Sequence, residues 1–439
     1  MIQWSLTGNT LILVYNLYPI SIYFVLHNNY ISFSLYRNGN LLTYKLSLSS
    51  WPFFTQEEAG AIQRVLLSNK VNYWTGQEGR EFEKEFACFA DSEYAIAVSN
   101  GSTALDLALN ALDVGAGDEV IVTSRTFIAS ISSIVNAGAK PVFADVDRDT
   151  QNITAETINA VLTDKTKAII CVHLAGWPCE MGEIMVLAEK YGLKVIEDCA
   201  QAHGAKYKGK SVGTFGDISA WSFCQDKIMT TGGEGGMVTT NDKSLWNTMW
   251  SFKDHGKSYD AIYKRQHPLG FRWLHESFGT NWRLTEMQSA IGRIQLTRMN
   301  DWTRIRGEHA TKLVHVCREF NCIRVPEVPN YIQHANYKFY VFVEPSQLND
   351  GWNRDKIIEV LNAEGIPVMQ GSCSEVYLEK AFDGTGFRPT ERLPIAKELG
   401  ETSLMFQVHP TITEKEINWV CEQLRIILKL ASINKRIKE

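Results

Sequence analysis

The sequence lacks an excess of positive charge. Among its 439 residues, 44 are Lys or Arg and 49 are Asp or Glu, which gives a formal net charge of −5 and a pI near 6.1. Because basic side chains supply most of the attraction to nucleic acid, this balance disfavours a nucleic-acid partner. Paired cysteines are also missing, since the nine cysteines are scattered and never spaced C-x-x-C. That pattern predicts free thiols in a reducing cytoplasm and no bound metal.

Two nucleotide-binding motifs are absent as well. No G-x-G-x-x-G follows a predicted strand, and no P-loop pattern occurs anywhere in the chain. The glycine-rich run Gly232-Gly233-Glu234-Gly235-Gly236 has the wrong spacing for a dinucleotide fingerprint and leads into a strand instead of a helix. The sequence therefore disfavours a Rossmann dinucleotide site and a P-loop phosphate site.

Acidic residues are missing from the first part of the chain, because none precedes Glu57. The most apolar stretch there, Leu11 to Tyr36, is interrupted by Asn16, Pro19 and the run His27-Asn28-Asn29. A bilayer span needs about 20 predominantly apolar residues, and a signal peptide needs a basic start and a small-residue cleavage site. We therefore interpret residues 1–50 as an extension outside the fold without firm membrane association, and a membrane anchor stays open as the alternative.

From Trp51 onward, β-rich and helical segments alternate. The strands expected at 118–123, 140–146, 167–173 and 193–198 begin about 22 to 27 residues apart, with helical patterns between them, as in repeated βαβ units. This alternation predicts an α/β fold with a three-layer, mainly parallel sheet. Residues 51–300 are expected to form this large domain and residues 301–439 a smaller C-terminal α+β domain.

Two polar groups fall where ligands of parallel sheets bind, just beyond the strand ends. The run Ser99-Asn100-Gly101-Ser102-Thr103 precedes an apolar helix, whose free N–H groups favour a phosphate. A simple helix N-cap is the alternative for this run. Asp198 closes the strand at 194–198, and a buried carboxylate needs a cation unless it serves as a cap or in a structural ion pair.

Two further groups follow later in the chain. Lys227 lies among hydroxyl-bearing and glycine residues between two expected strands, whereas most lysines are merely solvated. The polar loop Gly279–Leu284 precedes an apolar helix and is otherwise an ordinary turn. Together, an anion cradle, a carboxylate for a ring nitrogen and a lysine for an aldehyde match the needs of pyridoxal phosphate.

At this point the sequence resembles the DegT/StrS-type nucleotide-sugar aminotransferases, which are fold-type I pyridoxal phosphate enzymes. Nine ordered blocks carry the resemblance: Asn72-Tyr73-Trp74-Thr75-Gly76, Ser99-Asn100-Gly101-Ser102, Gly117-Asp118-Glu119-Val120-Ile121, Thr126-Phe127-Ile128-Ala129, Val172-His173-Leu174-Ala175-Gly176, Glu197-Asp198-Cys199-Ala200-Gln201, the Lys227 segment, Asp254-His255-Gly256, and Gly279-Thr280-Asn281-Trp282-Arg283. They span most of the chain from Trp51 and leave only the N-terminal extension unmatched.

The resemblance implies a role for each matched site residue. Lys227 would form the Schiff base with the cofactor, and Asp198 would pair with its ring nitrogen. Gln201 would bond the ring hydroxyl and Phe127 would stack on the ring, although an aromatic residue after a strand is often core. The phosphate would be held by Ser102, Thr103 and Ser222, and by Asn281 of a neighbouring subunit, which implies a homodimer. Arg125 departs from the family pattern and puts local sugar contacts in doubt.

The resemblance also implies the reaction. An amino acid, by family L-glutamate, would give its amino group to a nucleotide-linked keto-deoxy sugar for surface polysaccharide or a related glycan. A UDP-linked 4-keto-6-deoxy hexose is the first choice of acceptor. Two alternatives stay open, namely a pyridoxal-phosphate-dependent sugar dehydratase, in which relatives replace the lysine with histidine, and a non-catalytic regulatory member. Retention of Lys227, Asp198 and Gln201 together favours transamination.

Overall fold

The computed structural model describes residues 2–7, 10–17, 20–27, 30–37, 40–42 and 48–433. The chain divides into two compact units, Met1–Leu48 and Ser49–Glu439. In the first unit, five consecutive strands pair antiparallel in chain order. They are β1 (Ile2–Thr7), β2 (Thr10–Leu17), β3 (Ile20–His27), β4 (Tyr30–Arg37) and β5 (Asn40–Leu42). The other residues of the expected 1–50 extension, up to residue 47, lie outside the described residues, and its independence from the fold stays a prediction.

A seven-stranded sheet forms the centre of the second unit, with the order β6-β14-β13-β10-β9-β7-β8. Its strands are β6 (Tyr94–Val98), β7 (Glu119–Thr123), β8 (Lys140–Ala144), β9 (Thr166–Val172), β10 (Lys194–Asp198), β13 (Ile218–Ser222) and β14 (Gly236–Thr240). The run from β13 to β8 is parallel, whereas β14 is antiparallel to both of its neighbours. The predicted α/β fold with a mainly parallel sheet is therefore confirmed.

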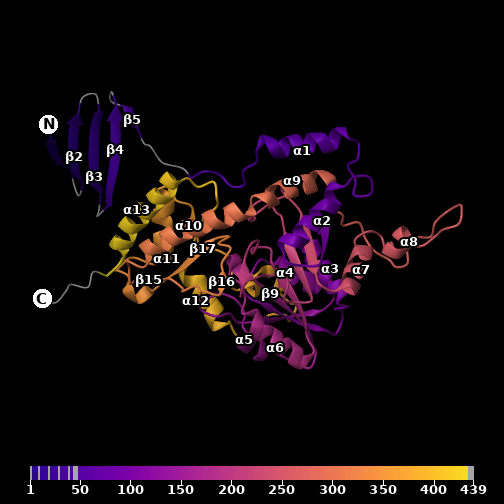
Figure 1. The fold of residues 1–439 in the computed structure, drawn as a ribbon. Helices are drawn as coiled ribbons and strands as arrows, with labels where there is room; N and C mark the ends of the chain where they lie inside the picture. The colour runs from indigo at the N-terminus through magenta and orange to yellow at the C-terminus, as the bar shows by residue number, and fades with distance from the viewer. Residues whose placement is uncertain are drawn as a thin grey trace. The chain divides into compact units, whose positions relative to one another are not determined.

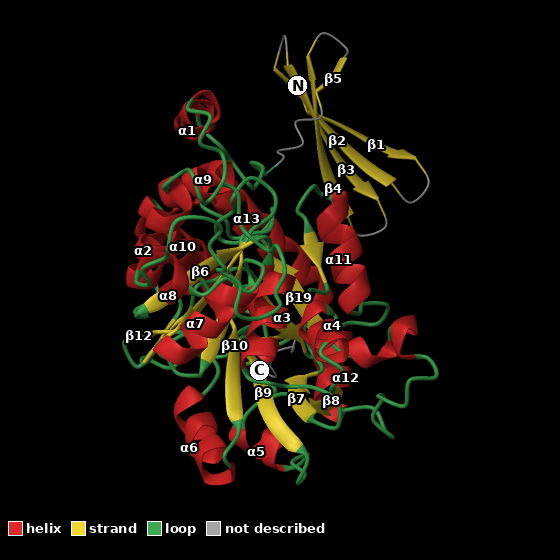
Figure 2. Ribbon diagram, turned by 90° about the vertical axis from the view of Figure 1, so that its right-hand side faces the viewer, coloured by secondary structure: helices red, strands yellow, loops and turns green. Residues whose placement is uncertain are grey.

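Apolar side chains alternate between the two faces of this sheet. Ile96 and Val98 of β6 join the core beneath α3, whereas Ala95 and Ala97 join the core on the opposite face with Phe82 of α2. Because successive side chains of a strand point to opposite faces, a strand covered on both sides reads as a continuous apolar run. Helices cover both faces, as Figure 2 shows. They include α2 (Glu78–Phe89), α3 (Gly101–Ala111), α4 (Ala129–Asn136), α5 (Ala155–Asn159), α6 (Met181–Tyr191) and α7 (Lys243–Phe252).

Helix α9 (Glu286–Thr297) lies between α2 and α1 (Gln56–Leu67) (Figure 1). The start of α1 is fixed by its own sequence. Thr55 accepts a hydrogen bond from the N–H of Glu57, and the Glu58 carboxylate accepts one from the N–H of Thr55 at 2.9 Å. This reciprocal cap explains why the amphipathic pattern becomes a helix at this point. A short helix, α8 (Tyr259–Tyr263), follows α7.

Two smaller sheets lie outside the main sheet of this unit, and one of them pairs β16 with strands from residues 206–211. A four-stranded antiparallel sheet has the order β15-β17-β19-β18, and a three-stranded sheet has the order β12-β11-β16. The strands are β11 (Lys206–Tyr207), β12 (Lys210–Ser211), β15 (Ile323–Arg324), β16 (Ile332–Gln333), β17 (Phe339–Val343), β18 (Val368–Met369) and β19 (Ser403–Phe406). The helices are α10 (Met299–Cys317), α11 (Arg354–Ala363), α12 (Pro394–Thr402) and α13 (Glu414–Ala431). The expected domain boundary near residue 300 falls at the start of α10 and stays a prediction.

The observed elements depart from the expected alternation in several places. The helix between the strands expected at 140–146 and 167–173 is only the five-residue α5, which ends at Asn159. Strand β6 was not anticipated, and it pairs with β14, which lies more than 130 residues later in the chain. None of the described helices combines the length and apolar character that a membrane span requires.

Candidate active site

The start of α3 lies against the end of β13. Asn100 caps the helix, because its side chain accepts a hydrogen bond from the N–H of Thr103 at 2.9 Å. A Cβ atom on Gly101 would lie only 2.7 Å from the Cβ of Ser222, so glycine allows this close approach. Thr103 uses its hydroxyl within the cap, donating to the Asn100 carbonyl at 2.8 Å, whereas Ser102 is exposed. The helix is capped by Asn100 and not by a Ser or Thr, as the simple N-cap alternative had it, and the helix end also brings Ser102, Thr103 and Ser222 into one region.

Asp198 ends β10 with its carboxylate buried. It accepts hydrogen bonds from the Ser130 hydroxyl at 2.8 Å and from the N–H of Ala200 at 3.1 Å. Burial raises the pKa of Asp198, although Ser130, Ala200 and the charge of Lys227 oppose this rise. Among the described residues, no basic group forms an ion pair with this carboxylate within 4.0 Å. A buried carboxylate with few donors is suited to a cationic ligand group such as a protonated ring nitrogen.

Gln201 lies three residues after Asp198, in the loop that follows β10. Its side-chain oxygen accepts a hydrogen bond from the N–H of Ala175 at 2.8 Å, beyond the end of β9. This bond fixes the orientation of the amide and leaves its NH₂ group as the donor for a ligand. Gln201 and Asp198 therefore offer a donor and an acceptor at the end of β10, next to the end of β9.

Lys227 lies in the loop between β13 and β14. Its side chain is 17% exposed, with Nζ 3.7 Å from a carboxylate oxygen of Asp226 and 5.2 Å from the centre of the Tyr337 ring. The backbone carbonyl of Lys227 accepts a hydrogen bond from the indole N–H of Trp51 at 2.9 Å. The loop is closed by a bridge between Cys224 and Gly233. The lysine is thus held at both its backbone and its side chain.

Phe127 and Arg125 follow β7 and have opposite environments. Phe127 is 68% exposed, so the interpretation of this residue as ordinary core is wrong. Arg125 is fully buried and donates to the side chains of Gln151 at 2.9 Å and Ser403 at 3.1 Å. Because Ser403 belongs to β19, Arg125 joins the main sheet to the C-terminal sheet instead of lining an open sugar site.

Asn281 is exposed, and its backbone forms a bridge with Asp254. Beside it, Trp282 accepts a hydrogen bond from the N–H of Ser99 at 2.9 Å, so this segment passes the start of α3. The structure thus brings Asp198, Gln201, Ser222 and Lys227 together around the ends of β13, β10 and β9. The role of Asn281 toward a neighbouring subunit stays a prediction.

The sequence profile of the DegT/DnrJ/EryC1/StrS aminotransferase family matches residues 52–425. The chain belongs to this family. The protein is a pyridoxal-phosphate-dependent sugar aminotransferase of this family. The resemblance drawn from the nine blocks is therefore confirmed.

The alignments of this chain with known relatives cover nearly the full length of each relative. A GDP-perosamine synthase of Escherichia coli O157:H7 is 37% identical over 85% of this chain and 96% of the relative. A UDP-N-acetyl-3-dehydro-alpha-D-glucosamine 3-aminotransferase of Acidithiobacillus ferrooxidans is 37% identical over 82% of this chain and 91% of the relative. The crystal structure of an aminotransferase from Psychrobacter cryohalolentis is 63% identical with a TM-score of 0.86, covering 87% of this chain and 99% of that one.

Sequence reasoning missed several residues of this family site. Ser130, which donates to Asp198, lies on α4 and is a common residue type without a motif of its own. Trp51 and Tyr337 contact the Lys227 loop from positions more than 100 residues away. The block Val172–Gly176 contains His173, but the sequence did not indicate which residue His173 contacts. Only the block-by-block match to the family indicated that this region carried a function.

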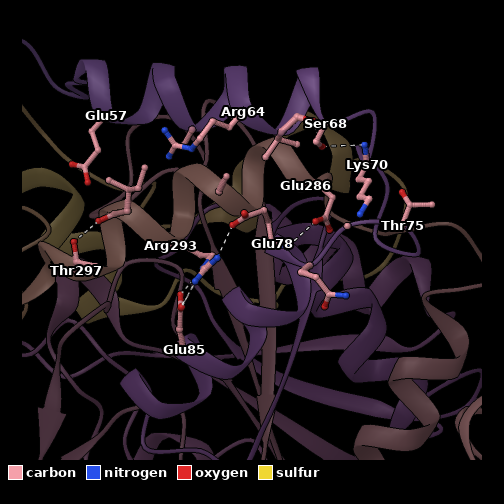
Figure 3. A pocket seen from close by; sticks show the side chains of 16 residues that line it. Glu57, Arg64, Ser68, Lys70, Thr75, Glu78, Glu85, Glu286, Arg293 and Thr297 are labelled. Carbon is pink, nitrogen blue, oxygen red and sulfur yellow. Dashed lines mark hydrogen bonds and ion pairs between the residues drawn. The ribbon is translucent and has the colours of Figure 1, made fainter.

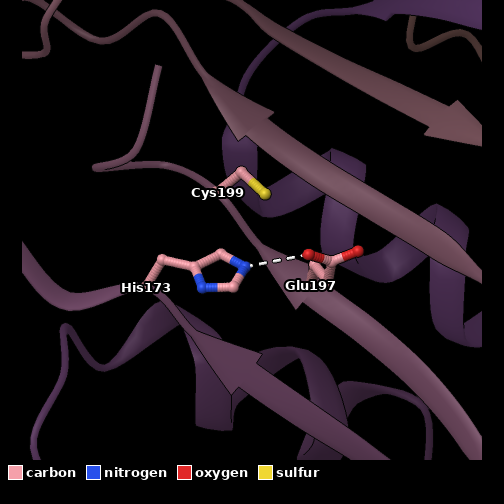
Figure 4. A group of neighbouring side chains, drawn as sticks. All are labelled: His173, Glu197 and Cys199. Atoms are coloured by element: carbon pink, nitrogen blue, oxygen red, sulfur yellow. Dashed lines mark hydrogen bonds and ion pairs between the residues drawn. The ribbon is translucent and has the colours of Figure 1, made fainter. Parts of the chain in front are cut away.

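Among the described residues, His173, Glu197 and Cys199 place ligand-type atoms within 4.8 Å of one another (Figure 4). His173 Nδ1 accepts from the N–H of Cys179 at 3.0 Å, so Nε2 carries the proton and donates to Glu197 at 3.0 Å. Both imidazole nitrogens are therefore used. Glu197 also accepts backbone N–H bonds at 2.8 Å from Gly213, Phe215 and Gly216. We interpret this group as a structural network that joins the ends of β9 and β10.

A cavity of about 610 Å³ lies between α1, α9 and the start of α2 (Figure 3). Charged side chains line it, and Arg293 pairs with Glu78 and Glu85 at 2.7 Å. Glu286 accepts from the N–H groups of Glu78 and Gly79 and so caps α2. None of the predicted cofactor residues lines this cavity, which is separate from the strand ends that carry them.

Proposed function

We propose that this protein transfers an amino group from L-glutamate to a nucleotide-linked keto-deoxy sugar, using pyridoxal phosphate, in the synthesis of a surface polysaccharide or related glycan. The observation that carries the proposal is the buried carboxylate of Asp198, which has no basic partner in the described residues and lies near Lys227. Family membership supports the reaction class, and the GDP- and UDP-linked sugars in the names of two relatives support the class of acceptor.

The residues at the strand ends fit the cofactor. Asp198 would accept from its ring nitrogen, Gln201 would donate to its ring hydroxyl, and exposed Phe127 would cover its ring. Ser102, Thr103 and Ser222, with the N–H groups at the start of α3, would hold its phosphate. When bound, pyridoxal phosphate supplies an aldehyde that accepts amines and a ring that accepts electron density.

Asp198 and Lys227 have distinct tasks in this proposal. A cation beside Asp198 favours its charged form against the cost of burial, so the carboxylate in turn keeps that cation protonated. Lys227 would hold the cofactor through Nζ, and its free amine would accept the proton removed from the donor carbon. The Trp51 and Asp226 contacts keep this amine near the position where the proton is transferred.

Retention of lysine at position 227 separates this proposal from the dehydratase alternative. The family resemblance links a histidine in place of this lysine to some dehydratases, whereas transfer of nitrogen needs a primary amine at this position. The donor and the acceptor would bind in turn, which predicts ping-pong kinetics.

We further propose a cytoplasmic homodimer with shared active sites. The segment before Asn281 exposes large apolar side chains, which supports its burial against a second copy. They are Leu269, Phe271, Trp273 and Phe278. The free cysteines support a reducing compartment.

The test is to incubate purified protein with L-glutamate and a panel of UDP-, GDP- and dTDP-linked keto sugars, and to identify aminated products by mass spectrometry. Borohydride reduction should fix the cofactor to Lys227, and Lys227→Ala should abolish turnover while leaving the fold intact. Cofactor recovered on another lysine, or sugar dehydration without nitrogen transfer, would contradict the proposal.

A further inference from the structure

Three cationic side chains gather around Tyr337. Nζ of Lys227 lies 5.2 Å and Nζ of Lys338 lies 4.9 Å from the centre of its ring. Arg306 donates to its backbone carbonyl at 3.3 Å. The Asp226 carboxylate, which accepts from the Tyr337 hydroxyl, lies 3.7 Å from Nζ of Lys227. Within the described part of the chain, neither Lys338 nor Arg306 forms an ion pair with a carboxylate, so this group carries excess positive charge.

Of the two unpaired cations, Arg306 is buried and Lys338 is partly buried, and both are withdrawn from water at a cost. Arg306 is only 1% exposed, and its Nε and Nη2 have no hydrogen-bond partner among the described residues. Burial lowers its pKa to about 9. Burial also lowers the pKa of Lys338 to about 8, opposed by Asp226 and reinforced by Arg306 and Lys227. Buried charges are normally paired, so an anionic ligand would offset this cost.

The position of the cluster indicates which anion it suits. The N–H of Tyr337 donates to the Ala175 carbonyl at 2.9 Å, beyond β9, whereas Ser222 and the start of α3 lie at the end of β13. In the sheet, β13 and β9 flank β10 on opposite sides. Tyr337 is therefore anchored beyond β9, across β10 from the phosphate cradle, and Lys227 and Asp226 reach it from the loop after β13.

We propose that Lys338 and Arg306 form an anion subsite that binds a carboxylate of the amino donor. This inference rests on the proposed function. An α-amino acid carries its carboxylate on the same carbon as its amino group, so a donor nitrogen at Lys227 brings a carboxylate to the Tyr337 side. The diphosphate of a nucleotide sugar is separated from its keto carbon by the sugar ring and suits this adjacent position less well.

The test measures the donor half of the reaction separately. Holoenzyme is mixed with L-glutamate without sugar, and conversion of the cofactor to its amine form is followed by absorbance. Lys338→Met should raise the half-saturating L-glutamate concentration about 10- to 100-fold, the loss expected for one charge-assisted hydrogen bond, with the limiting rate little changed. Lys338→Arg should restore most of the affinity. Lys338→Gln is a second uncharged variant. The same loss of affinity in both variants would assign the effect to the missing charge and not to a folding defect of one of them.

Lys190→Met is the matched control. Lys190 is exposed on α6, and its Nζ lies 4.8 Å from the ring of Tyr191, so it repeats the lysine–tyrosine contact away from the site. Glutarate supplies a second readout, since it carries carboxylates but no amino group to transfer. Calorimetry should find its binding weakened in the uncharged Lys338 variants and unchanged in Lys190→Met.

The outcomes distinguish this inference from the proposed function. If the parent enzyme aminates no sugar with L-glutamate, the proposed function is wrong. If the parent enzyme aminates a sugar with L-glutamate, but half-saturation and glutarate binding are unchanged in both uncharged Lys338 variants, only the anion subsite is overturned. Loss of affinity for the keto sugar as large as that for L-glutamate would assign the cluster to the nucleotide sugar and overturn the inference too.

Discussion

The connection between Trp51 and Lys227 predicts where the chain can be shortened. The two compact units divide between Leu48 and Ser49, and the family match begins at residue 52. Between these points, the N–H of Ser49 donates to Glu416 at 2.8 Å, and the indole N–H of Trp51 donates to the Lys227 carbonyl. Deleting residues 1–48 should therefore leave cofactor binding nearly unchanged, whereas deleting residues 1–51 should weaken it.

The contacts of Trp51 set the expected magnitude. Trp51→Phe keeps a ring but removes the indole donor, which should cost about 1–2 kcal/mol. Deletion through residue 51 also removes the ring that packs at 5.1 Å on Trp302 and at 5.2 Å from the Arg306 guanidinium. Those contacts add about 1–3 kcal/mol. Because the bond holds the lysine loop in one conformation, part of this energy is lost from cofactor affinity.

The assay is a titration of cofactor-free protein with pyridoxal phosphate, followed by absorbance at 25 °C. A loss of about 1–2 kcal/mol corresponds to roughly 5- to 30-fold weaker binding for Trp51→Phe, and deletion of residues 1–51 should weaken binding further. Deletion of residues 1–48 is the matched control. The reasoning is refuted if Trp51→Phe binds the cofactor within twofold of the parent, or if both deletions weaken binding equally.

Two further predictions concern assembly and pH. Asn281→Ala should weaken cofactor retention in a protein that sediments as a dimer, and a fully active monomer at assay concentration would contradict the shared site. Burial lowers the pKa of His203 to about 3 between the rings of Trp221 and Phe223, whereas the unfolded chain binds this proton below about pH 6.5. Stability therefore falls as the pH drops from about 6.5 toward 3. Urea unfolding from pH 7.5 to 4.5 should show a shallower fall for His203→Phe, and parallel curves would exclude His203 as a source of acid sensitivity.

Local patterns in the sequence were enough to predict the fold class and to name candidate cofactor residues. Apolar runs such as Val120–Val122 and Ile169–Ile170 are local patterns, and their regular alternation with helical segments is sufficient to predict a parallel sheet covered on both faces. The cap at Thr55 is likewise local, because its partner lies three residues away. The cofactor residues were indicated by ordered blocks that match a family, each readable without knowledge of its neighbours in space.

Which of these groups contact one another depends on long-range packing. Ser130 and Asp198 are 68 residues apart, Lys227 and Trp51 are 176 apart, and Asp226 and Tyr337 are 111 apart. No short-range pattern encodes such pairs, because each depends on how separate strands and helices pack. The exposure of Phe127 was likewise decided by packing, since an aromatic residue after a strand suits either a core or an open site. Sequence therefore identified the chemical groups, and the order of strands in the sheet brought them together at the carboxyl ends of neighbouring strands.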